Sequence, residues 1–190
     1  MSSSPPSTKK EEFNQLPRAF KQLQFQAVSL PLSCLLLPEY GSMAVLQSTK
    51  VLRTATALKE LPSVLILSND RRVPFPPLVH YGYALHIERM DELLEQKLGA
   101  EPGILDANPF GVLVHLQHEV FNYRVNFQTV YLDGTDSMFF LSVRSNWEPA
   151  PEADRLEKVV KRLKDFLDVD EEPVWCLDAR KSLWKKGSLM

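Results

Sequence analysis

A strict alternation of side chains between residues 78 and 88 constrains the fold more than any other feature of the sequence. The odd positions carry large apolar or aromatic side chains, whereas the even ones include His80, Gly82, Ala84 and His86. Because side chains alternate between the two faces of a strand, this pattern predicts a strand with one large apolar face. The small residues on the other face predict close packing there, by a helix, a ligand or a partner.

The rest of the chain carries patterns of both helical and strand periodicity. We expect helices over residues 43–60 and 153–167, and a further helix that follows the first alternating segment and ends at Gly99. We expect strands at residues 64–67, 78–88, 112–120, 123–131, 138–144 and 173–177, with a hairpin turn at Asp133-Gly134.

This order of short strands and helices predicts an α+β fold with a mainly antiparallel sheet and helices packed on one face. A ferredoxin-like split βαβ arrangement with added strands is the topological candidate. The 190 residues are enough for one large domain. We expect a disordered Ser/Pro leader at residues 1–12, a single α+β domain at residues 13–178, and a basic-aromatic tail at residues 179–190.

Composition excludes several classes of function. Lys and Arg number 22 against 24 Asp and Glu, so nothing in the charge balance favours DNA binding. The seven glycines form no phosphate-binding loop and no nucleophile elbow, and no apolar stretch is long enough to span a membrane. The two cysteines form no CxxC pair. We therefore expect a soluble, cytoplasmic protein without a cofactor.

Four histidines are the candidates for chemistry. On the strand expected at residues 112–120, His115 and His118 point to opposite faces and cannot share a metal ion, so we predict no metal site. His80 and His86 share one face but lie roughly 20 Å apart. His80, His86 and His115 are the candidate acid–base residues, because a histidine at a pocket rim suits proton transfer near neutral pH.

Candidate binding residues fall in two places. Tyr81, Tyr123 and Arg124 could line a pocket against the sheet, beside the candidate histidines. Trp184 and Lys185 lie in the basic tail, where cations interleaved with apolar side chains suit an acidic partner, an anionic lipid or an RNA backbone.

Two classes of function follow from these observations. The first is a non-catalytic interaction or regulatory module that binds a protein partner. The second is a small cofactor-free enzyme of the isomerase, cyclase or lyase type, or a small-molecule binding protein, with a His-lined pocket against the sheet. We place the first ahead, since no strong catalytic motif occurs in the sequence.

Overall fold

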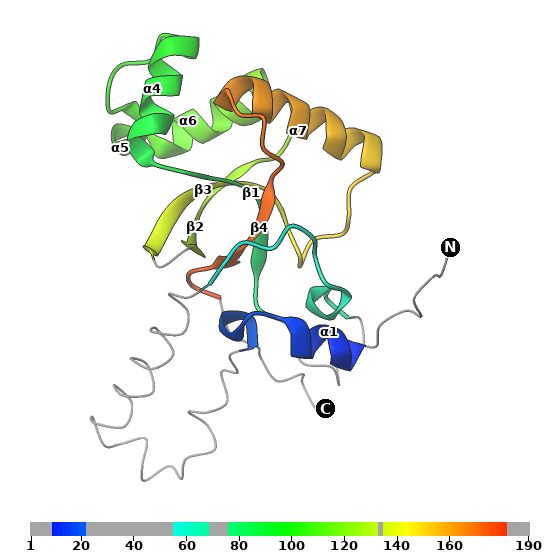
Figure 1. The fold of residues 1–190 in the computed structure, drawn as a ribbon. Coiled ribbons are helices and arrows are strands. Elements are labelled where there is room, and N and C mark those ends of the chain that lie inside the picture. Colours follow the sequence, from blue (N-terminus) through cyan, green and yellow to red (C-terminus); the bar gives the residue numbers. More distant parts are fainter. Residues whose placement is uncertain (1–8, 22–54, 69–75, 133–134, 182–190) are drawn as a thin grey trace, which may run out of the picture.

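A computed structural model of the chain describes residues 9–21, 55–68, 76–132 and 135–181 (Figure 1). Its centre is a closed barrel of four antiparallel strands in the order β1-β3-β2-β4. The barrel closes because β4 pairs with both β1 and β2. The strands are β1 (Val79–Leu85), β2 (Asn126–Leu132), β3 (Thr135–Ser145) and β4 (Val174–Asp178).

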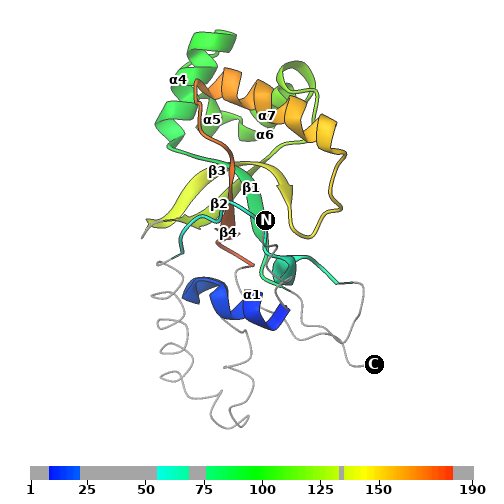
Figure 2. The same cartoon turned by 45° about the vertical axis from the view of Figure 1, so that its right-hand side comes forward.

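Helices flank the barrel on two sides, as Figures 1 and 2 show. The helices α4 to α7 gather on one side, and α1 and η3 lie on the other. The α-helices are α1 (Lys9–Gln15), α4 (Ile87–Leu98), α5 (Ile104–Ala107), α6 (Pro109–His115) and α7 (Ala153–Leu167). Short 3-10 turns are η1 (Arg18–Lys21) and η3 (Ser63–Leu65), and η4 (Leu116–Val120) is a π-helical turn that continues α6.

The apolar core is divided by the barrel wall into three clusters. The largest lies between the barrel and helices α4 to α7, and it includes Tyr83, Leu141 and Leu163. The second joins the opposite side of the barrel to α1 and η3. The third fills the barrel itself, around Val130, Phe140 and Cys176. The strands β1 and β4 therefore bury most of their residues, whereas β2 is mostly half-buried.

Gly82 shows why the even positions of β1 carry small residues. A Cβ atom at this position would lie 2.0 Å from the carbonyl oxygen of Leu141 and 3.0 Å from the ring of Phe140. The register between β1 and β3 also shifts beside Gly82. The close packing predicted for this face is present, and the neighbouring strand of the closed barrel supplies it, not a helix.

The predicted fold class is confirmed in its coarser part, an α+β fold with antiparallel strands. The ferredoxin-like candidate is wrong, because that arrangement is an open sheet whereas β4 here closes the sheet into a barrel. Helices also cover more than one face, since α1 and η3 pack opposite to α4 to α7. None of the helices in the described part of the chain is long and apolar enough to cross a membrane.

Several predicted elements are confirmed. The alternating segment is β1, the helix ending at Gly99 is α4, and α7 covers residues 153–167. Gly99 adopts φ 64°, in the left-handed region that glycine enters without a steric penalty. The hairpin strands appear as β2 and β3, although Asp133 and Gly134 lie outside the described residues.

Three predicted elements are wrong. Residues 112–120 are helical, because Asn108 caps α6 through the N–H of Gly111 and Pro109 occupies its first turn. The apolar run at residues 64–67 begins in the 3-10 turn η3 and forms no strand. Residues 55–60 are not helical, and the rest of the helix predicted over residues 43–60 lies outside the described residues.

The division into leader, domain and tail stays a prediction. Helix α1 begins at Lys9, within the segment predicted to be a leader. Residues 1–8 and 182–190 lie outside the described part of the chain.

Candidate functional site

The candidate histidines do not come together. His86 precedes α4 as its N-cap residue, and His115 ends α6; both side chains are exposed. His118 is also exposed, in η4. The opposite-face argument for His115 and His118 no longer applies, because both lie on helical turns. No group of three or more His, Cys, Asp or Glu side chains in the described ranges is placed to hold a metal ion.

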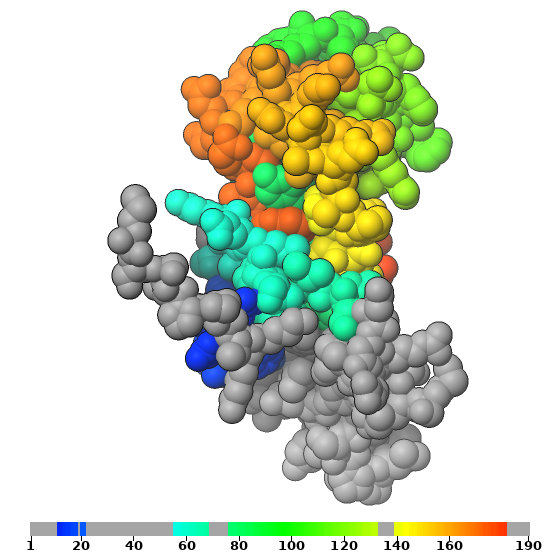
Figure 3. Space-filling model, turned by 90° about the vertical axis from the view of Figure 1, so that its right-hand side faces the viewer, coloured from blue at the N-terminus to red at the C-terminus, as the bar shows by residue number. Residues whose placement is uncertain are grey.

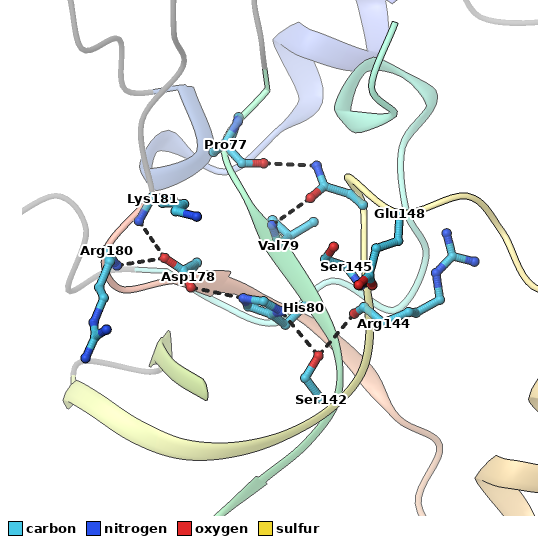
Figure 4. A network of polar contacts seen from close by, with 11 residues as sticks. Pro77, Val79, His80, Ser142, Arg144, Ser145, Glu148, Asp178, Arg180 and Lys181 are labelled. Atoms are coloured by element: carbon cyan, nitrogen blue, oxygen red, sulfur yellow. Dashed lines mark hydrogen bonds and ion pairs between the residues drawn. The ribbon is translucent and has the colours of Figure 1, made fainter. Parts of the chain in front are cut away.

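His80 is buried inside the barrel and has a polar partner on each side (Figure 4). Its Nδ1 lies 3.2 Å from the hydroxyl of Ser142 on β3, and its Nε2 lies 3.0 Å from Oδ2 of Asp178 on β4. A carboxylate only accepts, so the Nε2–H of His80 donates to Asp178. The hydroxyl of Ser142 also lies 3.2 Å from the carbonyl of Arg144. This network joins three of the four strands.

Asp178 is held by more than His80. Its Oδ1 accepts hydrogen bonds from the backbone N–H groups of Arg180, at 2.8 Å, and Lys181, at 2.5 Å. Burial alone would raise the pKa of the carboxyl group, but these three donors overcome that effect and hold the pKa below its ordinary value. The ionised carboxylate is therefore the form that fits this site.

Serine, histidine and aspartate together raise the question of a nucleophilic triad. In such a triad the serine hydroxyl must reach a substrate, with space beside it for a developing oxyanion. Ser142 is only 2% exposed, His80 and Asp178 are each 5% exposed, and neither pocket described below includes any of the three. This buried network is arranged to join strands, since each side-chain polar atom of His80 and Asp178 has a hydrogen-bond partner within the protein.

A second buried polar residue, Asn146, forms hydrogen bonds that link segments at the same end of the barrel. Its Oδ1 accepts from the N–H of Val79 at 2.9 Å. Its Nδ2 donates to the carbonyls of Leu65 and Pro77 at 2.7 and 3.0 Å. Asn146 thus ties the end of β3 to η3 and to the start of β1.

Two adjoining pockets on the surface share the half-buried Tyr123 as a common wall. The first, here called the β3 pocket, has a volume of about 230 Å³ and includes Arg124, Arg144 and Glu148. The second, here called the α7 pocket, has a volume of about 220 Å³ and includes cations from α7. In Figure 3 the gold atoms of α7 adjoin the light-green atoms of α6 and of the segment after it, on the face toward the viewer.

The cations of these pockets define one surface, which we call the Tyr123 surface. Besides Tyr123 it comprises Arg124, Arg144, Arg155, Lys158 and Arg162. None of the five cations forms an ion pair with a carboxylate of the described residues. The only acidic residue lining either pocket is Glu148. The two pockets are therefore lined by five cations and one carboxylate, on a chain whose formal net charge is −2.

Two of the guanidinium groups of the Tyr123 surface pack over aromatic rings. Arg155 lies over the ring of Tyr123, with 5.2 Å between its Cζ atom and the ring centroid. Arg144 lies over Trp175 at 5.3 Å, and its buried Nε has no hydrogen-bond partner among the described residues. Arg162 donates from Nη1 to the carbonyl of Phe121 at 2.6 Å. The guanidinium groups are thus positioned before any ligand arrives.

The predicted binding residues divide between this surface and other places. Tyr123 and Arg124 both line the β3 pocket. Tyr81 lies in neither pocket; its ring packs against Trp175 with centroids 5.0 Å apart, and burial, followed by the nearby Glu172, raises the pKa of its hydroxyl. Trp184 and Lys185 lie outside the described residues.

Sequence reasoning missed the cations of α7, although a signal was present. In a helix over residues 153–167, Arg155, Lys158 and Arg162 have spacings of three and four residues and share one stripe. The prediction of this helix rests on its apolar face, which does not include these three cations. Arg144 carried no such signal, because its place beside Tyr123 depends on how β3 packs.

Asp178 and Ser142 carried no signal either, since their meeting with His80 depends on the closure of the barrel. No family model, curated protein or solved structure matches this chain.

Proposed function

We propose that the protein is a non-catalytic interaction module that binds an acidic segment of a partner protein through the Tyr123 surface. The observation that carries the proposal is the gathering of five cations without a carboxylate partner in the described part of the chain. Like charges at close range repel one another. An anionic ligand would relieve this repulsion, so its binding would be favourable.

The sizes of the pockets support a chain of residues as the ligand. Their volumes of about 230 and 220 Å³ fall below the roughly 300–1,000 Å³ typical of pockets for drug-sized molecules. Each pocket suits one side chain, and Tyr123 between them suits contact with the intervening segment. Tyrosine and arginine are also the residue types enriched at protein interfaces.

The alternative of an enzyme with a His-lined pocket has less support. His86 and His115 are exposed and line neither pocket, and His80 is enclosed within the barrel. The β3 and α7 pockets contain tyrosine, arginine, lysine, asparagine and one glutamate, Glu148, but no histidine. Their chemistry favours binding an anion over transferring a proton.

A binding experiment with a charge-reversal variant tests the proposal. A fluorescently labelled oligo-glutamate peptide is titrated with the full chain, and binding is followed by fluorescence anisotropy at low and high salt. We expect the double variant Arg155→Glu, Lys158→Glu to bind at least about tenfold more weakly, because attraction becomes repulsion. Added salt should also weaken wild-type binding, since exposed charges are screened.

The matched control is Lys161→Glu, which reverses one charge of α7 at an exposed position outside both pockets, as the single variant Lys158→Glu does inside the α7 pocket. Near wild-type affinity is expected for this variant. Equal losses in Lys161→Glu and in the single variant Lys158→Glu would mean that net charge alone drives binding, and the proposal would then fail. It would also fail if wild-type protein did not bind the peptide at low salt.

A further inference from the structure

We propose further that the α7 pocket is a phosphate site that accepts a phosphorylated side chain of the partner. This inference rests on the proposed function and specifies the chemistry of its ligand. It is carried by the meeting of Arg155, Lys158 and Arg162 in one small pocket beside Tyr123.

The charge of the α7 pocket fits a phosphate monoester better than a carboxylate. Three cations line the pocket, and none of its other lining residues is acidic. A phosphorylated serine, threonine or tyrosine carries about −1.5 to −2 charges at pH 7, against −1 for a carboxylate. A phosphate group therefore balances the three cations more nearly than a glutamate or aspartate side chain does.

The guanidinium groups of the α7 pocket are held in place, but most of their N–H donors remain available to a ligand. Arg162 spends one N–H on the carbonyl of Phe121 at 2.6 Å, which leaves most of its five N–H donors available. Arg155 lies over the ring of Tyr123, with 5.2 Å between its Cζ atom and the ring centroid, a contact that uses none of its five N–H donors in a hydrogen bond. Planar guanidinium groups held in this way suit bidentate bonds to phosphate oxygens.

The neighbouring β3 pocket contains a carboxylate, so the phosphate is assigned to the α7 pocket and not to the β3 pocket. Glu148 lines the β3 pocket, and its Oε2 accepts a hydrogen bond from the backbone N–H of Ser145 at 2.7 Å. That bond fixes the carboxylate in the pocket that Arg124 and Arg144 also line, where it would repel a dianion. The β3 pocket therefore suits a polar residue of the same segment, through the side chain of Asn126 and the two arginines.

Three labelled peptides that differ at one central residue separate the phosphate inference from the proposed function. The peptides carry serine, glutamate or phosphoserine within the same acidic sequence, and anisotropy measures their affinity for the full chain. We expect phosphoserine to bind about tenfold more tightly than glutamate, and glutamate more tightly than serine.

The substitution Lys158→Gln should bring phosphoserine binding down toward that of the glutamate peptide, with a smaller loss for the glutamate peptide itself. The matched control is Lys161→Gln, on the same helix but outside the pocket, which should keep the preference for phosphoserine. Thermal melting of both variants checks that the fold is retained.

Each other outcome overturns a defined part of the argument. Equal affinity for the glutamate and phosphoserine peptides would overturn the phosphate site but leave the acidic-segment proposal standing. Failure of all three peptides to bind would overturn both. Tighter binding of a single-stranded RNA oligomer, lost in Lys158→Gln, would assign the pocket to a nucleic-acid backbone and overturn the phosphorylated protein segment.

Discussion

Nε2 of His80 lies 3.0 Å from Oδ2 of Asp178, a contact that joins the first and last strands of the barrel across 98 positions of the chain. Both residues are only 5% exposed. The same carboxylate receives the backbone N–H groups of Arg180 and Lys181, so one side chain fixes both barrel closure and the path of the chain after β4.

The substitution Asp178→Asn should make stability less sensitive to acid. The pKa of Asp178 is lowered from 3.8, so its carboxylate stabilises the folded state above the ordinary carboxyl pKa. This contribution is lost as pH falls through the lowered pKa. At pH 7 we expect the variant to lose about 2 kcal/mol of unfolding free energy, and the difference from wild type to shrink below about pH 4. Urea denaturation followed by tryptophan fluorescence measures both quantities, and a difference independent of pH would contradict this account.

The substitution Gly82→Ala should destabilise the barrel because the new methyl group has no space. Its Cβ would lie 2.0 Å from a backbone oxygen, which cannot rotate away as a side chain can. We expect a loss of at least about 2–3 kcal/mol, at the upper end of overpacking effects. The control is Gly99→Ala, where no atom lies within 4 Å and only the left-handed φ costs about 1 kcal/mol. Urea denaturation of the two variants should separate these costs, and equal losses would contradict a steric cause at Gly82.

The substitution Asn146→Ala should leave three buried backbone groups without a side-chain partner. These are the N–H of Val79 and the carbonyls of Leu65 and Pro77. Each unsatisfied buried group costs about 1–3 kcal/mol. We expect a total loss of about 3 kcal/mol by chemical denaturation, against less than about 0.5 kcal/mol for Asn14→Ala at an exposed position. A loss below about 1 kcal/mol at Asn146 would show that these bonds are replaced by water.

Local patterns predicted the elements whose signals lie within a few residues. The alternation around Tyr81 and Tyr83 predicted β1, and the stripe that includes Leu163 predicted α7. Alternation failed at residues 112–120, where the spacing of four between Val112 and Leu116 also fits one buried face of a helix and Val114 is exposed. Asn108 and Pro109, an N-cap residue followed by proline, were the better guide.

The barrel and the Tyr123 surface could not be predicted in the same way. The small residues at Gly82 and Ala84 correctly predicted close packing, but whether a helix or another strand supplies it depends on pairing between distant segments. The sequence predicted part of the Tyr123 surface, since Tyr123 and Arg124 were candidate binding residues. The cations that complete the surface lie on α7 and β3, and their approach to Tyr123 follows from tertiary packing.

Tyr123 allows the contribution of its ring to ligand binding to be separated from that of its hydroxyl. The ring lies under the guanidinium of Arg155, and a phenylalanine ring would support that contact equally well. We expect Tyr123→Phe to bind the oligo-glutamate peptide like wild type, and Tyr123→Leu to bind about two- to fivefold more weakly, because Arg155 loses its support at a cost of roughly 0.5–1 kcal/mol. Leucine keeps an apolar side chain against the neighbouring core, so melting temperatures should stay similar. Anisotropy titration measures the affinities, and equal weakening by both substitutions would instead identify the hydroxyl as the group that contacts the ligand.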